Sequence, residues 1–235
     1  MFHGKMKALT FSYDDAVTQD VRLIELFNKY GMKATFNLNS ELLGTKNNLV
    51  RDGVQITHNK VDAKDVRAIY AGHEVAAHTL THPALREQTD EEVIRQVEQD
   101  RLKLSELVGY EVVGMAYPGG GINFDDRIAK LIEENTGVKY ARTGSTTQSF
   151  APYTDLYQYK GSIYHHVEWD KMLEMGEAFL NMKADSPQVF YIFGHAYEFD
   201  IWPERWAQFE DFLEMLSGRD DIFYGTNKEI LLKRM

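Results

Sequence analysis

The chain of 235 residues contains no cysteine. Without thiols it can form neither a disulfide bond nor a metal site made of thiolate ligands. Basic residues are also few relative to acidic ones: 26 lysines and arginines stand against 36 aspartates and glutamates, so the formal net charge is −10. This sign of charge repels nucleic acid phosphates and anionic membrane surfaces. We therefore expect neither as a partner, whereas a neutral or cationic substrate is compatible with it.

The sequence also lacks internal repeats, low-complexity tracts and linkers rich in proline or serine. We expect a single folded domain over residues 1–235, and the 43% hydrophobic content is ordinary for a globular chain. No apolar run is long enough for a membrane span or a signal peptide. As written, the chain is expected to be cytoplasmic, or secreted if a leader has been removed. The oligomeric state is not indicated.

Hydrophobic periodicity predicts strands that alternate with helices. The expected strands are 7–11, 34–38, 74–77, 112–116, 139–143, 189–193 and 222–224. The expected helices are 18–30, 62–71, 89–108, 125–135, 169–182, 203–216 and one after Thr226. Asp62 is expected to cap the second of them, and Thr89 with Glu92 and Thr226 with Glu229 to cap the third and the last. A hairpin turns at Asp52-Gly53, and 144–161 is left unassigned apart from one possible strand. This alternation predicts an α/β fold with parallel strands. Closure into a barrel is favoured over an open sheet, because the usual glycine-rich phosphate loop after the first strand is missing.

Chemically capable side chains follow five of these strands. They are Asp14-Asp15, His78 with His82, the Tyr-Pro-Gly-Gly segment 117–120, Arg142 and His195. In a barrel of parallel strands the carboxyl ends meet on one face, which is where such folds do their chemistry. The spacing therefore predicts an active site on that face.

The sharpest motif is the pair His78 and His82. Their imidazoles can converge on one ion if the segment forms a helical turn or a tight loop. Asp14 and Asp15 repel each other unless a cation or a partner compensates their charge. Two imidazoles and one carboxylate leave open positions on a divalent ion, and the second carboxylate is then free to act as a base. Taken singly, these histidines and acids would be read as solvated loop residues; the combination favours a metal site.

Segments 10–15 and 72–83 resemble the polysaccharide deacetylase (NodB-like) family of carbohydrate esterases. The resemblance covers nearly the whole chain and implies a distorted, seven-stranded (β/α) barrel. Position by position, it implies that Asp15, His78 and His82 bind the metal ion. It also implies that Asp14 is the catalytic base and that His195 is the acid.

The resemblance extends to the substrate site. Tyr117, Gly119, Trp169 and Phe193 are expected to contact the substrate. Among them, a backbone amide near Gly119 holds the oxyanion, and Trp169 helps to wall the acetyl pocket. Phe193 stands where the family usually has leucine.

The chain departs from the family pattern in two places. The family's third motif often begins with an arginine that orients the base, but here the segment is Met115-Ala116-Tyr117. Arg142, at the end of the next strand, is our hypothesis for its replacement, with a surface arginine as the alternative. The fourth motif, Asp-Trp, is matched only loosely by residues 168–170, so the acid that pairs with His195 stays open among Glu168, Asp170, Glu198 and Asp200.

The reaction that this resemblance implies is metal-dependent removal of an N-acetyl group from an acetylated amino sugar. Zinc is the expected ion, with cobalt, nickel or iron as alternatives. Two other functions stay open: hydrolysis of another amide or ester, such as acetylated xylan or a ring amide, and a catalytically silent carbohydrate- or metal-binding domain. The silent domain is disfavoured because it would need neither Asp14 nor His195. His3, His58 and His73 are expected to be structural or solvated, whereas for His165 and His166 a place facing the site stays open.

Overall fold

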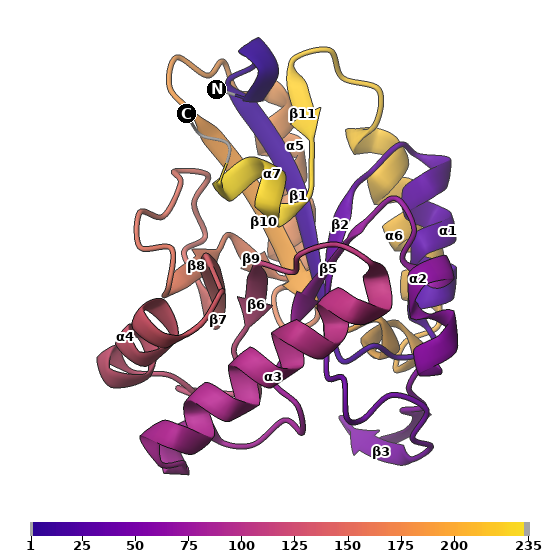
Figure 1. Ribbon diagram of the computed structural model, residues 1–235. Coiled ribbons are helices and arrows are strands. Elements are labelled where there is room, and N and C mark those ends of the chain that lie inside the picture. Colours follow the sequence, from indigo (N-terminus) through magenta and orange to yellow (C-terminus); the bar gives the residue numbers. More distant parts are fainter. Residues whose placement is uncertain (1, 233–235) are drawn as a thin grey trace.

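The computed structural model describes residues 2–232. Within them, strands of one parallel sheet alternate with helices that pack around it (Figure 1). The strands of this sheet are β1 (Lys7–Asp14), β2 (Ala34–Leu38), β5 (Glu74–Ala77), β6 (Gly114–Ala116), β7 (Tyr140–Thr146), β8 (Tyr159–Gly161), β9 (Ile163–Tyr164), β10 (Gln188–Gly194) and β11 (Ile222–Tyr224). The helices are α1 (Asp20–Lys29), α2 (Val66–Ile69), α3 (Asp90–Val108), α4 (Asp126–Asn135), α5 (Trp169–Asn181), α6 (Glu204–Leu216) and α7 (Asn227–Leu231), and β3 (Asn48–Arg51) with β4 (Val54–Thr57) forms a separate hairpin.

The sheet follows the order β8-β7-β6-β5-β2-β1-β10-β9, and β11 pairs with the first part of β1. Its two ends, β8 and β9, are consecutive in the chain and are separated only by Ser162. One short segment therefore meets both edges of the sheet, which curls without closing. The predicted parallel α/β fold of a distorted barrel is confirmed. The structure has nine strands in this sheet: the seven predicted ones, which include β11, and in addition β8 and β9.

Side chains of β1 alternate between two environments, as the two-residue period of a strand requires. Leu9, Phe11 and Tyr13 belong to the large core between the sheet and the helices. Ala8 and Asp14 face the other way, and Ala8 belongs to a second buried cluster with Tyr191 and Phe193. The strand is longer than the predicted 7–11, because Ser12 and Tyr13 still pair with both β2 and β10, and Asp14 still pairs with β2. This extension brings Asp14 into the strand itself.

Helix ends explain most of the remaining differences from prediction. Thr89 accepts a hydrogen bond from the backbone of Glu92, and Thr226 with Glu229 forms a complete capping box, as their sequence patterns predict. Asp62 was expected to cap a helix through its side chain. It makes no such hydrogen bond, and only short turns follow, at Ala63–Asp65 and Val66–Ile69. That prediction was wrong, because a suitable residue type does not by itself produce cap geometry.

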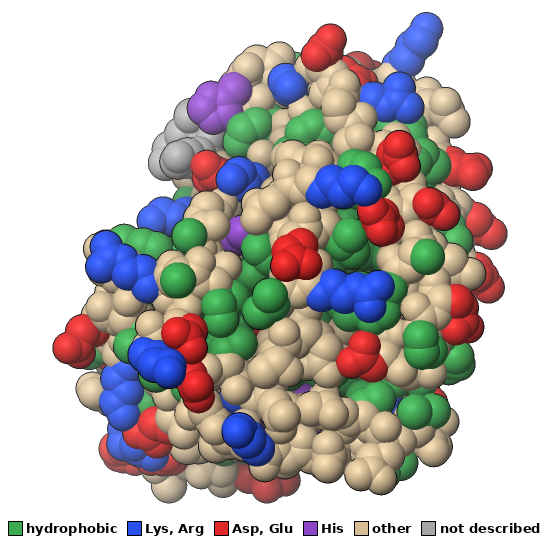
Figure 2. All heavy atoms as spheres, turned by 90° about the vertical axis from the view of Figure 1, so that its right-hand side faces the viewer, with side chains coloured by type: hydrophobic (Ala, Val, Ile, Leu, Met, Phe, Trp, Pro, Cys, Tyr) green, Lys and Arg blue, Asp and Glu red, His purple; other side chains and the backbone are tan. Residues whose placement is uncertain are grey.

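The surface of the helical layer is polar. Figure 2 shows acidic and basic side chains interspersed with apolar ones on the face that carries α1, α2 and α6. Among residues 2–232, no helix combines the length and apolar character that crossing a membrane requires.

Candidate metal and catalytic site

The predicted site residues lie at the carboxyl ends of the parallel strands, on the side of the molecule that also carries the β3–β4 hairpin (Figure 1). Asp14 ends β1, His78 directly follows β5, Arg142 lies within β7, and His195 directly follows β10. Each of these strands is buried on both faces. The site is therefore built on rigid elements.

The three predicted metal ligands come together. One ligand atom from each of Asp15, His78 and His82 lies within 4.8 Å of the others. The Nε2 atoms of both histidines are 3.9 Å from Oδ1 of Asp15. Asp15 and His82 have positive φ angles of 86° and 59°, which side-chain-bearing residues rarely adopt and which often marks a functional site. The loops are held in an unfavourable backbone conformation that turns these side chains toward one point.

The second nitrogen of His78 makes it suitable as a ligand. Nδ1 donates a hydrogen bond to the carbonyl of Ala116 at 2.9 Å, so Nε2 carries the free lone pair. Within the described residues Nε2 is buried and has no hydrogen-bond partner. Burial lowers the pKa of His78 to about 4, so the ring is neutral at ordinary pH. A buried, neutral, unpartnered imidazole beside a carboxylate fits a divalent cation.

Helix α3 supports the same loop from behind. One carboxylate oxygen of Asp100 accepts a hydrogen bond from the backbone of His78 at 2.9 Å. Its other oxygen accepts one from the backbone of Ser40 at 2.7 Å. Asp100 thereby ties the segment after β2 to the segment after β5.

Asp14 is held by an arginine. Nη2 of Arg142 lies 2.5 Å from each carboxylate oxygen, and Asn37 donates to Oδ1 at 2.8 Å. Arg142 is only 2% exposed, and its guanidinium lies 4.5 Å from the centre of the Phe193 ring. Burial alone would raise the pKa of Asp14, but the attraction of Arg142 outweighs it and the pKa is lowered. The alternative of a surface arginine is wrong, and Asp14 is ionised and oriented.

His195 pairs with Glu198, one of the four acids left open by the sequence. Nδ1 lies 3.2 Å from Oε1 of Glu198, whose other oxygen accepts from the backbone of His195 at 3.0 Å. The same carboxylate contacts Tyr164 and the Nε2 atom of His165. Burial alone would lower the pKa of His195, but Glu198 outweighs it and raises the pKa to about 9. The ring is therefore protonated at neutral pH, as an acid catalyst must be.

Replacing Glu198 by Gln should move the alkaline limb of the pH profile. In the wild type, the proton on His195 is present below pH about 9 and is lost as the pH rises through that value. Without the carboxylate, the pKa should fall toward its ordinary value of about 6.5 or lower. We expect kcat at pH 8 to fall about tenfold or more relative to the wild type, while the loss at pH 6 is smaller.

The matched control is Asp200→Asn. Asp200 accepts hydrogen bonds from Trp206 and Gln19 and not from His195, so its pH profile should match that of the wild type. If Glu198→Gln retains the wild-type alkaline limb, Glu198 does not set the charge of His195.

Three residues that the sequence did not single out as functional also reach the site, all from the hairpin and the segment after it. Nε2 of His58 lies 3.1 Å from Oδ2 of Asp15, and Nζ of Lys60 lies 3.4 Å from Oδ1. Arg51 lies 3.6 Å from Glu198 and lines the cavity. The expectation that His58 is merely structural or solvated was wrong. Its neighbours in the sequence carry no metal-ligand spacing, so no pattern signalled the contact.

A cavity of about 420 Å³ joins these groups. Its wall contains all three metal ligands, Asp14, Arg142 and His195, and also the predicted substrate contacts Tyr117, Gly119 and Phe193. Trp169 is not among the described residues that line it. That side chain is 7% exposed and packs near Phe199 and Phe209 in the core, so the expectation that it walls the acetyl pocket is not supported by its position.

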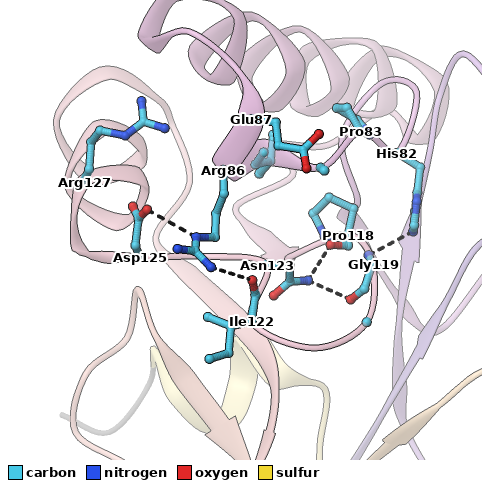
Figure 3. Close-up of a pocket in the computed structure, with 13 residues that line it drawn as sticks. His82, Pro83, Arg86, Glu87, Pro118, Gly119, Ile122, Asn123, Asp125 and Arg127 are labelled. Carbon is cyan, nitrogen blue, oxygen red and sulfur yellow. Dashed lines mark hydrogen bonds and ion pairs between the residues drawn. The ribbon is translucent and has the colours of Figure 1, made fainter.

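A second, larger cleft of about 690 Å³ adjoins this cavity and shares His82, Gly119 and Gly120 with it. Figure 3 shows its wall: the loop after His82 on one side and residues 118–127 on the other. The backbone of Gly119 donates to Nε2 of His82 at 3.2 Å, and Asn123 holds the Gly119 carbonyl at 2.8 Å. Arg86 and Asp125 lie 3.6 Å apart across the cleft wall. His82, one of the predicted ligands, thus stands where the smaller cavity meets the larger cleft.

A family model for polysaccharide deacetylases matches residues 2–141, more than half of the chain. No curated protein sequence matches the chain. Among solved structures, the polysaccharide deacetylase Bc1974 from Bacillus cereus is 16% identical, with a TM-score of 0.55, over 94% of this chain and 91% of its own. The Xyl-CE4 domain of a multidomain xylanase from the hindgut metagenome of Trinervitermes trinervoides is 14% identical, with a TM-score of 0.55, over 97% and 91%.

A third structure is BA3943, described as a CE4 family pseudoenzyme from Bacillus anthracis. It is 15% identical, with a TM-score of 0.56, over 96% of this chain and 66% of its own. This chain spans 55% of the Streptococcus pyogenes deacetylase PplD. At these identities, the similarity shows a shared fold. The activity must be argued from the residues of the site.

Proposed function

Because this chain belongs to the polysaccharide deacetylase family, we propose that it is a metal-dependent hydrolase that removes N-acetyl groups from an amino sugar or a short oligosaccharide. The observation that carries the proposal is the pairing of base and acid beside the three ligands. Oδ2 of Asp14 and Nε2 of His195 lie 4.0 Å apart. Each has its own buried counter-charge, Arg142 for the base and Glu198 for the acid.

Asp15, His78 and His82 would hold a divalent ion, which would supply a Lewis acid for the acyl carbonyl and would lower the pKa of water. Asp14 is ionised and takes a proton from the attacking water. The backbone amide of Gly119 donates to Nε2 of His82 in the metal-free site; once that nitrogen binds an ion, the amide is free to donate to the developing oxyanion. His195 gives its proton to the amine as the carbon–nitrogen bond breaks. The proton that Asp14 gains replaces the one that His195 gives up, and the acetic acid passes its own proton to the amine or to solvent, so the products are acetate and an amine or ammonium group.

The protonation states of Asp14 and His195 support their assignments as base and acid. A general base must be unprotonated and a general acid protonated at the same pH. The lowered pKa of Asp14 and the raised pKa of His195 meet both conditions at neutral pH. A silent carbohydrate-binding domain would require neither residue to be held in such a state.

The cleft bears on the size of the substrate. The cavity of about 420 Å³ is suited to the acyl group and one sugar ring, while the adjoining cleft of about 690 Å³ leaves room for further rings. Polar side chains such as Arg86, Asp125 and Arg127 along its wall can bind hydroxyl groups. This arrangement favours an oligosaccharide over a single sugar.

Acetate release tests the proposal. We expect acetate from acetylated chitooligosaccharides in the presence of zinc, with kcat/KM rising from the single sugar to its longer oligomers. Chelation should abolish the release, and added zinc or cobalt should restore it. Acetylated xylan and a ring amide, tested in parallel, examine the alternative hydrolases. If the chain binds the ion but cleaves no amide or ester, the silent binding domain replaces this proposal.

A further inference from the structure

We propose that Lys60 is a built-in counter-ion of Asp15 that competes with the metal ion for one carboxylate oxygen, while His58 holds the other oxygen in position for the ion. This inference rests on the metal site of the proposed function. It assigns opposite effects on metal affinity to two residues of one segment, neither of which is a metal ligand.

The backbone fixes both side chains opposite Asp15. Val61 donates to the carbonyl of Ala16 at 2.9 Å, and Thr18 donates to the carbonyl of Asn59 at 2.8 Å. Val17 and Lys60 form an isolated antiparallel bridge. The segment that carries His58 and Lys60 is thus hydrogen-bonded to the loop that directly follows Asp15. This backbone pairing, rather than a flexible loop, holds the side chains of His58 and Lys60 next to the carboxylate of Asp15.

The two oxygens of Asp15 have different neighbours. Oδ2 lies 3.1 Å from Nε2 of His58, whose other ring nitrogen contacts the side chain of Asn47 at 3.1 Å. Oδ1 lies 3.4 Å from Nζ of Lys60 and 3.9 Å from the Nε2 atoms of His78 and His82. The oxygen that faces both imidazoles, and is therefore the one placed to share an ion with them, is also the one that Lys60 contacts.

Lys60 is only 6% exposed, so its ammonium cannot rely on water for solvation. Its neighbours within hydrogen-bonding reach are Asp15 and His58. Asp14 already has Arg142 as a buried counter-charge. Each of the two adjacent aspartates therefore has its own counter-charge, Arg142 for Asp14 and Lys60 for Asp15. The ammonium group of Lys60 therefore lies beside the position proposed for a divalent ion, and the two positive charges repel each other.

These contacts predict effects of opposite sign. Removing the charge of Lys60 leaves Asp15 without a counter-ion, so a divalent ion should bind more tightly and the metal-free protein should be less stable. Removing the ring of His58 frees Oδ2 and lets the carboxylate rotate, so the ion should bind less tightly. His58 is thus a positioning residue, as groups that hold a metal ligand in place often are.

The experiment is titration of the metal-free, full-length protein with zinc by calorimetry, together with its melting temperature with and without zinc. We expect Lys60→Met to tighten zinc binding by about tenfold or more and to lower the melting temperature of the metal-free form. His58→Ala should weaken zinc binding by about 10-fold to 100-fold. Lys60→Arg keeps the charge and should bind zinc within a few-fold of the wild type. If Lys60→Met does not fold without zinc, Lys60→Gln repeats the test with a polar side chain of similar length.

The outcomes separate this inference from the function on which it rests. A wild-type chain that binds no divalent ion overturns the metal-dependent function and the inference with it. A wild type that binds zinc, with Lys60→Met and Lys60→Gln binding it equally or more weakly, overturns the inference alone. A purely structural lysine would give that second result, because loss of packing loosens the site.

Discussion

Replacing Asp14 by Asn is expected to lower kcat by about 10³-fold, within the range by which a positioned general base accelerates a reaction. Asn has nearly the same shape but cannot accept the proton of water. The three metal ligands are untouched, so zinc affinity should change by only a few-fold. Acetate release and zinc titration on the same preparation measure the two effects separately.

Stability must be measured alongside. The substitution leaves Arg142 buried without its partner, and breaking a buried ion pair in this way costs about 3–5 kcal/mol. Activity should therefore be assayed well below the melting temperature of the variant. Asp170→Asn is a matched control, because Asp170 is exposed in the first turn of α5 and should retain wild-type activity. Full activity of Asp14→Asn would falsify its assignment as the base.

Replacing Arg142 by Ala should reduce kcat by about 10²-fold, because Asp14 loses both its orientation and the charge that keeps it ionised. Removing that charge lets burial raise the pKa of Asp14, so the acid limb of the pH profile should move to higher pH. The sign follows from the wild type: the base is active above its lowered pKa and is lost as the pH falls through it. The pH dependence of kcat/KM measures the shift.

Arg142→Lys separates charge from geometry. Lysine keeps the positive charge but cannot reproduce the planar fork of the guanidinium, so its acid limb should stay near that of the wild type while kcat remains reduced. Arg95→Ala, which removes an exposed arginine paired with Glu92 on α3, controls for loss of a surface charge. If turnover of Arg142→Ala is unchanged, the arginine does not orient the base.

The layout of the fold could be predicted from the sequence because each strand carries its own signal. Buried strands read as short apolar runs, and parallel topology then brings their carboxyl ends to one face. This reasoning placed the pair Asp14-Asp15 near His78 and His82, and the family resemblance singled out Asp15 as the ligand. The structure brings Asp15, His78 and His82 together. The two-residue period of a strand also explains why the side chain of Arg142 is buried. Arg142 lies two residues beyond Tyr140 in β7, so both side chains point to the same buried face.

Contacts that depend on loop conformation could not be predicted. His58 and Lys60 approach Asp15 because a hairpin folds back over the loop after β1, and neither turn chemistry nor periodicity specifies where such a hairpin lies. The partner of His195 was left open for the same reason. The short turn Ala196–Asp200 directs Glu198 toward His195 and Asp200 toward Trp206. The expected role of Trp169 in the acetyl pocket rested on a loose motif match, and its side chain packs into the core instead.

The pairing of β1 with β10 has a consequence for the order of events during synthesis. Lys7 lies opposite Gln188, and Tyr13 lies opposite Gly194, so one edge of the first strand has most of its partners only when nearly the whole chain has been made. The metal ligands are complete at residue 82, whereas the acid follows at residue 195. At roughly 5 to 20 residues per second, this delay is on the order of ten seconds. In the nascent chain, the residues proposed to bind the metal ion are therefore all present well before the proposed acid is added.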